Sequence, residues 1–232
     1  MDEYVEQHSS PSSELTRWIR EETATRCPAW ADIGSSKSQG GFLAMLVSLQ
    51  RPASILEIGT FAGHGAVSMA ERLPQGGRLV TVDNSAADPV ALDIAQRAFA
   101  HSTVAGRISL EIADAGEYLK STTESYDLIF VDADKPNYLN YLDVICDRQL
   151  MKPSGVMIFD NTLWGGRVLE PDLPESEDFE SEPDPEAWVR LMQDDWARHV
   201  RAFNNEVLTR PGFEVVLAPI ADGMTLIRVQ RD

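Results

Sequence analysis

The sequence lacks long apolar runs, clustered cysteines and an excess of basic residues. No stretch approaches the ~18 consecutive apolar residues of a membrane span, and the N-terminus is polar and acidic, unlike a signal peptide. Cys27 and Cys146 lie far apart, so no C-x-x-C motif or disulfide framework is present. The formal net charge of −17 disfavours nucleic acid and anionic membranes as partners. We therefore expect a cytoplasmic protein that binds neither.

Two catalytic signatures are missing as well. The sequence contains no His/Cys cluster of the kind that holds zinc, because His8, His101 and His199 have no partners at metal-ligand spacing. It also contains no G-x-S-x-G segment, which excludes the usual nucleophile elbow of a serine hydrolase.

Strands and helices alternate through the middle of the chain. With 232 residues, 43% of them hydrophobic, we expect a single domain over 1–232 with a substantial core. Such alternation is typical of an α/β fold in which helices cover both faces of a doubly wound, mostly parallel sheet. The expected strands are 53–58, 78–83, 107–112, 126–131 and 154–159, and the expected helices are 65–73, 88–100, 115–120 and 137–149.

The N-terminal part precedes this alternation. Residues 1–52 are expected to form a helical cap that covers the ligand edge of the sheet. Within it, 1–12 is rich in serine and predicts a loose arm, and apolar periodicity predicts helices over 13–28 and 38–52.

The C-terminal part also departs from the alternation. Residues 170–186 contain nine acidic residues and no Lys or Arg, which predicts a solvated loop or a lid that screens substrates by charge. Strands at 213–217 and 224–229 are joined by a short turn and should pair antiparallel. The helix before them offers more apolar surface than one sheet needs, so we expect a homodimer. Its apolar side carries Trp188, Leu191 and Met192.

A glycine-spaced turn follows the first strand. Gly59, Gly63 and Gly65 let the backbone approach a ligand closely. Glu57 precedes this turn, and Asp83 ends the next strand, where an acid suits the hydroxyls of a ribose. The turn alone is equally consistent with tight packing, but the two acids beside it favour a cofactor site. Its spacing, G-x-x-x-G-x-G, differs from the dinucleotide fingerprint G-x-G-x-x-G, which disfavours NAD.

Polar residues also follow two later strands. Asp132 comes after the strand at 126–131, and Asp160 and Asn161 come after the strand at 154–159. Ligands of open α/β sheets bind beyond the carboxyl ends of strands, so these side chains should converge if the strands are neighbours. Alone, Asp132 is a capping or turn residue; together, the three hard oxygen donors predict a Mg²⁺ site.

Four segments carry a resemblance that covers nearly the whole chain. Ser38–Leu43, Phe130–Tyr138, Asp160–Val168 and Gly223–Thr225 resemble the cation-dependent O-methyltransferases, the family of catechol and caffeoyl-CoA O-methyltransferases. The turn after Glu57 likewise resembles motif I of S-adenosylmethionine-dependent methyltransferases, E-x-G-x-x-x-G. The resemblance implies a Rossmann-like, seven-stranded sheet with one antiparallel strand. It further implies S-adenosylmethionine and Mg²⁺ or another divalent cation as cofactors, a small phenolic substrate with vicinal hydroxyls, and a homodimer.

The same resemblance implies roles for individual residues. Asp132, Asp160 and Asn161 match metal ligands, Lys135 matches the catalytic lysine that acts as general base, and Trp164 matches an aromatic residue of the acceptor pocket. The residues that match cofactor-binding positions are Glu57, Gly59, Gly63, Gly65, Asp83, Asp114, Ala115, Asp132 and Asp134. Because a phenol has a pKa near 10, chelation of two adjacent hydroxyls by a metal would favour the phenolate that attacks the methyl group.

The chain departs from the family at the turn. Relatives often carry a Tyr-Ser pair where this chain has His64 and Gly65, so Ser68 or a backbone amide is expected to hold the cofactor carboxylate instead. Two rival functions stay open: an NAD-dependent dehydrogenase, and a non-catalytic cofactor-binding or dimer-forming protein on the same fold. The second rival is disfavoured by the joint presence of Asp132, Lys135, Asp160 and Asn161.

Overall fold

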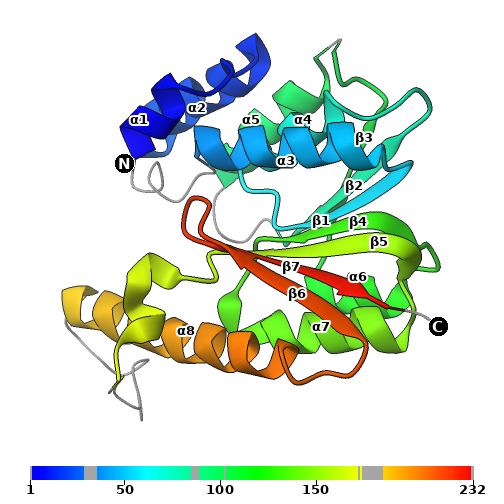
Figure 1. Cartoon of the computed structure of the whole chain (residues 1–232). Coiled ribbons are helices and arrows are strands. Elements are labelled where there is room, and N and C mark those ends of the chain that lie inside the picture. The colour runs from blue at the N-terminus through cyan, green and yellow to red at the C-terminus, as the bar shows by residue number, and fades with distance from the viewer. Residues whose placement is uncertain are drawn as a thin grey trace.

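The computed structural model describes residues 2–28, 36–84, 89–101, 103–171, 173 and 185–230, without the side chains of residues 2, 3 and 185–188. Within these residues, seven strands form one sheet in the order β3-β2-β1-β4-β5-β7-β6 (Figure 1). β7 runs antiparallel to β5 and β6, and the other four strand pairs are parallel, which confirms the predicted mixed α/β sheet. The strands are β1 (Ser54–Ile58), β2 (Arg78–Asp83), β3 (Ile108–Ile112), β4 (Tyr126–Val131), β5 (Met151–Asp160), β6 (Phe213–Ala218) and β7 (Met224–Val229).

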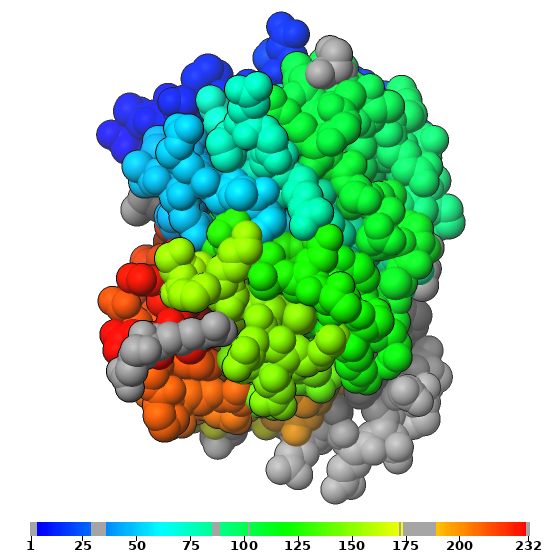
Figure 2. Space-filling view, turned by 90° about the vertical axis from the view of Figure 1, so that its right-hand side faces the viewer, coloured from blue at the N-terminus to red at the C-terminus, as the bar shows by residue number. Residues whose placement is uncertain are grey.

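Helices cover both faces of this sheet. The first face carries α2 (Glu14–Arg26), α3 (Lys37–Gln50), α4 (His64–Ala70) and α5 (Pro89–Phe99), and the second carries α6 (Ala115–Ser121), α7 (Tyr138–Asp147) and α8 (Pro185–Val207). The N-terminal helices and α8 lie at opposite ends of the molecule, as the blue and orange segments of Figure 2 show. No helix in the described ranges is both long and apolar enough to cross a membrane.

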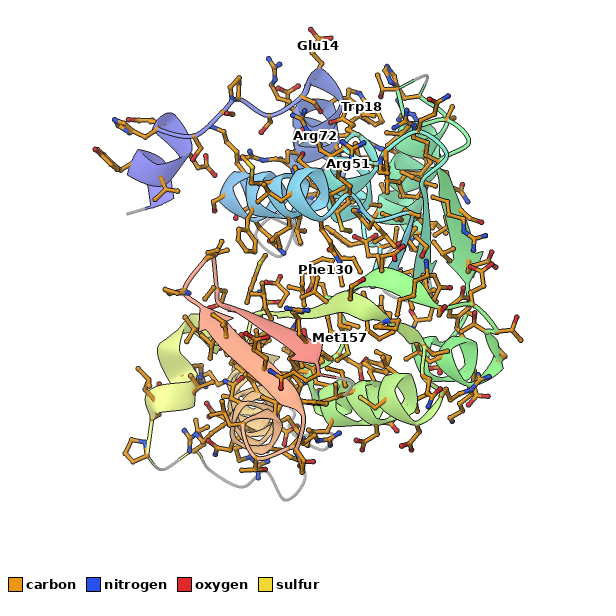
Figure 3. The ribbon with its side chains drawn as sticks, turned by 45° about the vertical axis from the view of Figure 1, so that its right-hand side comes forward. Glu14, Trp18, Arg51, Arg72, Phe130 and Met157 are labelled. Carbon is orange, nitrogen blue, oxygen red and sulfur yellow. The ribbon has the colours of Figure 1, made fainter. Side chains whose placement is uncertain are left out.

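Two apolar cores result from this arrangement. Successive residues of a strand point to opposite faces, so Phe130 of β4 packs toward α3 and α4 while Met157 of β5 packs toward α7 and α8 (Figure 3). The central strands are buried on both faces, which is why they are almost continuously apolar. β1 is buried throughout, and the Glu57 side chain lies within it.

The sheet order creates a switch point between β1 and β4. From β1 the chain proceeds to β2 and β3 on one side, and then crosses to β4 and β5 on the other. Both β2 and β4 pair parallel with β1, so the chain leaves all three strands at the same edge. A crevice is expected beyond this edge, where the connections diverge to opposite faces.

The N-terminal arm was wrongly predicted to be loose. Residues Asp2–Gln7 form a short helix, α1. Its end is held locally, because the rings of Tyr4 and His8 stack with centroids 3.9 Å apart and Lys37 of α3 donates to the carbonyl of Glu6. Apolar periodicity could not reveal this helix, because its described side chains are mostly exposed. The predicted acidic loop at 170–186 lies almost wholly outside the described residues.

Candidate active site

The turn between β1 and α4 brings two strand ends together. Gly59 has φ +96°, and a Cβ on it would lie 1.9 Å from the carbonyl oxygen of Asp132. A Cβ on Gly65 would lie 2.5 Å from Oε1 of Glu57, and one on Gly63 would meet the Phe99 ring of α5 at 2.8 Å. Gly59 therefore allows the end of β4 to approach closely, Gly65 allows the buried Glu57 carboxyl, and Gly63 allows α5.

Glu57 is a buried carboxyl beside this turn. It is 1% exposed and accepts a hydrogen bond of 2.6 Å from the Thr81 hydroxyl. Burial raises the pKa of Glu57 to about 8, with smaller contributions from Asp132 and Asp83, while the Thr81 hydrogen bond opposes the rise. A cationic ligand near this carboxyl would favour its ionised form.

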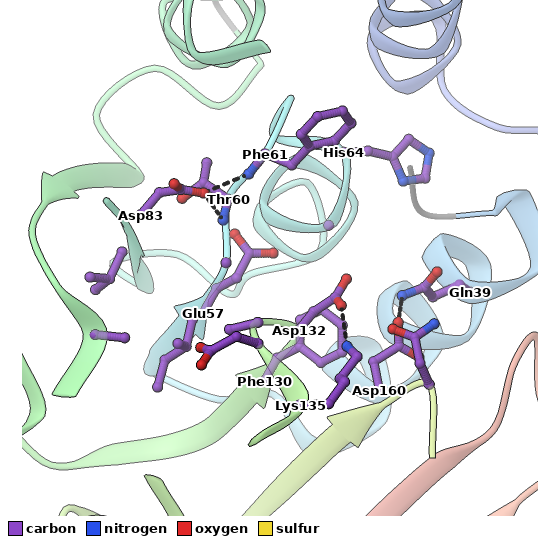
Figure 4. A pocket seen from close by; sticks show the side chains of 18 of the residues that line it. Gln39, Glu57, Thr60, Phe61, His64, Asp83, Phe130, Asp132, Lys135 and Asp160 are labelled. Carbon is purple, nitrogen blue, oxygen red and sulfur yellow. Dashed lines mark hydrogen bonds and ion pairs between the residues drawn. The ribbon is translucent and has the colours of Figure 1, made fainter. Parts of the chain in front are cut away.

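Asp83 joins the end of β2 to the same turn. One of its oxygens accepts from the backbone N–H groups of Thr60 and Phe61, both at 2.9 Å (Figure 4). Asp114, after β3, caps α6 by accepting from the Glu117 N–H at 2.9 Å, and Ala115 follows it. Asp83, Asp114 and Ala115, which the family resemblance matched to cofactor-binding positions, all line one cavity.

Ser68 lies one turn farther along α4. Its hydroxyl donates to the carbonyl of His64 at 2.8 Å, and it is not among the residues that line the cavity. His64 does line the cavity, and burial lowers the pKa of its imidazole to about 4, so that the ring is neutral at physiological pH. Contact between Ser68 and a cofactor carboxylate stays a prediction.

Lys135 lines the same cavity, beyond the end of β4. It follows β4, is 3% exposed, and its Nζ donates to Asp132 Oδ1 at 3.3 Å and to the Tyr138 hydroxyl at 2.7 Å. The Tyr138 hydroxyl in turn donates to the carbonyl of Asp160 at 2.8 Å. Tyr138 therefore holds both the lysine and the end of β5, a role that sequence reasoning missed.

Asp160 is buried on the other side of Lys135, as Figure 4 shows. It is 1% exposed, and its Oδ2 accepts from Gln39 Nε2 of α3 at 2.5 Å. Its Oδ1 is buried and has no hydrogen-bond partner among the described residues. Burial and then the neighbouring Asp132 raise the pKa of Asp160 to about 8, against the effect of Lys135. Asn161, with φ +55°, follows Asp160 and also lines the cavity.

Asp134 is held by two donors. The Tyr141 hydroxyl donates to its Oδ1 and the Asn137 amide donates to its Oδ2, both at 2.5 Å. Neither donor was singled out from the sequence, although Asn137 belongs to the segment Phe130–Tyr138 that carried the family resemblance. Asp134 therefore lines the cavity as a hydrogen-bond acceptor whose position is constrained.

Two tryptophans form an aromatic wall at the far end. Trp164, predicted for the acceptor pocket, donates from its indole N–H to the carbonyl of Gln193 at 2.9 Å. Its ring lies 5.4 Å from that of Trp196, centroid to centroid, and 5.9 Å from Lys135 Nζ. Trp196 comes from α8, and nothing in the sequence placed it beside Trp164.

All these groups surround one cavity of about 870 Å³ at the carboxyl edge of the sheet. One cavity therefore contains both parts of the candidate site, the part with Glu57 and Asp83 and the part with Lys135 and Asp160. It is large enough for two small molecules. Of the predicted site residues, the cavity is lined by Glu57, Gly59, Gly65, Asp83, Asp114, Ala115, Asp132, Asp134, Lys135, Asp160, Asn161 and Trp164.

Comparison with known proteins identifies relatives of both sequence and structure. An O-methyltransferase family model matches residues 6–230. The chain is 31% identical to a caffeoyl-CoA O-methyltransferase of Medicago sativa over 93% of this chain and 81% of that protein. The SAH-bound methyltransferase PaMTH1 of Podospora anserina matches with a TM-score of 0.84 at 29% identity, covering 99% of this chain and 93% of its own. TomG of Streptomyces achromogenes, in complex with SAM, has a TM-score of 0.75 at 27% identity, with 99% and 96% covered.

A sheet of this order, with a cavity at its switch point, defines a Rossmann-like methyltransferase. The chain belongs to the O-methyltransferase family. The predicted fold and enzyme class are thereby confirmed, and the dehydrogenase alternative is not supported.

Proposed function

We propose that this O-methyltransferase transfers the methyl group of S-adenosylmethionine to one hydroxyl of a catechol-type phenol, with Lys135 as general base and a divalent metal at Asp132, Asp160 and Asn161. One observation supports the proposal: a buried lysine lies between two acidic strand ends, in a cavity that Glu57 and Asp83 also line. The relatives support it, because PaMTH1 is SAH-bound and TomG is in complex with SAM.

The donor half has groups that suit this cofactor. Asp83 ends β2, where a carboxylate suits ribose hydroxyls, and Asp114 and Ala115 line the wall expected for the adenine. Burial raises the pKa of Glu57, and a sulfonium cation nearby would favour its carboxylate form. Asp134 is held by Tyr141 and is suited to the ammonium of the methionyl end.

The metal half fits a hard divalent cation in its donor chemistry. Asp160 has a buried oxygen without a hydrogen-bond partner among the described residues, and its pKa is raised next to Asp132. Both features are expected of a carboxylate whose counter-charge is a bound ion. The described residues contain no group of three or more His, Cys, Asp or Glu side chains placed to hold a metal. The protein ligands would therefore be two carboxylates and the Asn161 amide oxygen, a set typical of Mg²⁺.

A divalent cation bound there would favour the phenolate form of a chelated catechol. Lys135 would accept the hydroxyl proton on Nζ while the acceptor oxygen forms its bond to the methyl carbon. The carbon–sulfur bond breaks, and its electron pair stays on sulfur as a neutral thioether. Holding donor and acceptor in one cavity can supply about 7–11 kcal/mol of the barrier reduction.

The direct test is an assay with S-adenosylmethionine and a panel of catechols, with and without a chelator, read as methylated product by mass spectrometry. Monomethylated product should form, disappear with chelator and return with added Mg²⁺. Binding of S-adenosylhomocysteine without turnover of any catechol or phenol would favour the non-catalytic alternative. Undiminished turnover in chelator would exclude the metal.

Neutral or cationic catechols should be preferred over coenzyme A thioesters. The thioester carries phosphates that need cationic partners, whereas Arg167 and Arg198 near the acceptor wall are already paired with Asp194 and Asp195. The acidic segment 170–186 adds negative potential if it lies within the screening length of about 8 Å at physiological salt. We therefore expect a higher kcat/KM for a neutral catechol than for caffeoyl-CoA, with a ratio that shrinks as salt rises. A preference for the thioester at either salt would contradict this prediction.

We further propose that the protein is a homodimer. Met45 and Leu49 on α3 are 59% and 73% exposed, and Val216 on the edge strand β6 is 58% exposed. Val216 pairs with Leu226, which packs into the α3 side of the core, so the three residues lie on the same side of the sheet. Exposed apolar groups on one side favour association with a second copy. Light scattering at micromolar protein should give the mass of a dimer; a monomer alone would refute the proposal.

A further inference from the structure

The segment after β5 has an unusual backbone. Asn161 and Trp164 have φ values of +55° and +48°, and Gly165 has +60°. Non-glycine residues rarely adopt this left-handed region, and they persist in it only where surrounding structure holds them. This short segment carries both the proposed metal ligand Asn161 and the aromatic wall residue Trp164.

The turn between β6 and β7 holds this segment. The N–H groups of Thr162 and Leu163 donate to the carbonyls of Gly223 and Asp222, at 3.0 and 2.9 Å. Gly223 has φ +88°, and a Cβ on it would lie 2.5 Å from the Leu163 side chain. The two backbones are therefore in direct contact, and the sequence had indicated only a hairpin turn here.

The Asp222 side chain makes two further contacts with the same segment. Its Oδ1 accepts from the Gly165 N–H at 2.6 Å. Burial raises the pKa of Asp222, and the Asn161 side chain opposes this rise as a hydrogen-bond donor. A carboxylate only accepts, so Asn161 must present its amide nitrogen to Asp222. The amide oxygen of Asn161 is then the atom left to face the cavity, and oxygen is the atom that a hard cation requires.

We propose that Asp222 is a positioning residue for the acceptor half of the site: it selects the amide orientation of Asn161 and holds the left-handed segment that carries Trp164. The inference rests on the proposed function, because it assumes a divalent cation at Asp132, Asp160 and Asn161. Asp222 acts through Asn161 and is not itself a ligand in this proposal. Partners of metal ligands typically contribute about 10–100-fold to metal affinity.

The test measures Mn²⁺ binding by electron paramagnetic resonance, and S-adenosylhomocysteine binding by calorimetry, in wild type, Asp222→Ala and Asp222→Asn. Asp222→Ala should raise the Kd for Mn²⁺ by about 10–100-fold and leave the Kd for S-adenosylhomocysteine unchanged. Asp222→Asn should show a smaller loss, because its amide oxygen can still accept from the Gly165 N–H, whereas its amide nitrogen cannot accept from Asn161.

Asp127→Ala is the matched control. Asp127 is also a carboxylate that accepts backbone N–H groups, those of Ala53 and Ser54, but it lies at the opposite edge of the sheet. Its loss should lower the Tm without changing the Kd for Mn²⁺.

Three results would overturn the inference. The first is wild-type Mn²⁺ affinity in folded Asp222→Ala or, if that variant does not fold, in Asp222→Asn. The second is an equal loss of affinity for both ligands. The third is wild-type protein that binds S-adenosylhomocysteine but no Mn²⁺, which refutes the metal in the proposed function as well. Mn²⁺ binding by wild type together with unaltered binding by the Asp222 variants would leave the proposed function standing.

Discussion

Asp160→Ala should lower kcat/KM for a catechol about a thousandfold, which corresponds to the several kcal/mol that a bound cation contributes to charge stabilisation. Asp160 supplies the buried oxygen that has no hydrogen-bond partner among the described residues, so its removal takes away the main anionic ligand. The affinity for S-adenosylhomocysteine should stay at the wild-type value, because Glu57 and Asp83 lie in the other half of the cavity. Calorimetry and steady-state kinetics on the same preparation separate the two effects.

Asp160→Asn is the companion variant, because its amide oxygen can still accept from Gln39 and its volume is the same. In the folded protein without metal, the pKa of Asp160 is raised from 3.8 to about 8, mainly by burial. The folded state therefore holds the proton more tightly than the unfolded state, and stability falls as pH rises between about 4 and 8. Asparagine does not titrate, so Asp160→Asn should not lose stability in this way as pH rises.

In chelator, the Tm of Asp160→Asn should therefore exceed that of wild type by a margin that grows up to about pH 8. Wild-type activity in either Asp160 variant would refute the proposal that Asp160 is a metal ligand. A Tm difference that does not change with pH would contradict a raised pKa of Asp160 in the protein without metal.

Lys135→Ala should lower kcat by about 10²–10⁴-fold, the usual contribution of a general base, and change the Kd of the acceptor much less. Lys135 is buried, and hydrogen bonds to Asp132 and Tyr138 fix its Nζ. In the proposed complex, Nζ lies next to the acceptor hydroxyl. The metal ligands remain in the variant, and they can still hold a catechol. Because KM can include kinetic terms, the acceptor Kd should be measured directly, in the presence of S-adenosylhomocysteine.

Two variants sharpen this test. Lys135→Met keeps most of the apolar volume of the side chain, so a similar loss of kcat would assign the effect to the amine rather than to packing. Lys120→Ala removes an exposed lysine that pairs with Glu117 on the surface of α6, and its kcat should match wild type. If kcat and acceptor Kd of Lys135→Ala both equal the wild-type values, another group is the base.

Local sequence patterns were enough to predict the α/β sheet and the edge at which the candidate site lies. Nearly continuous apolar runs such as 54–58 and 126–131 are typical of parallel strands that are buried on both faces. The structure shows these two strands almost wholly buried. Acids that follow such strands, Asp83, Asp132 and Asp160, must then share one edge, since parallel strands end on the same side. This inference needs only local periodicity and the direction of the strands.

Tertiary structure alone decided what surrounds those acids. Gln39 donates to Asp160 from 121 positions away, Trp196 reaches Trp164 from α8, and Asp222 reaches Gly165 from the β6–β7 turn. Each contact joins elements whose relative placement depends on how the two cores pack. A residue's own neighbours in the chain carry no signal of such a partner, because a Gln, a Trp or an Asp on an exposed face gives the same local pattern. Local sequence thus positions the acids, and packing between distant elements positions their partners.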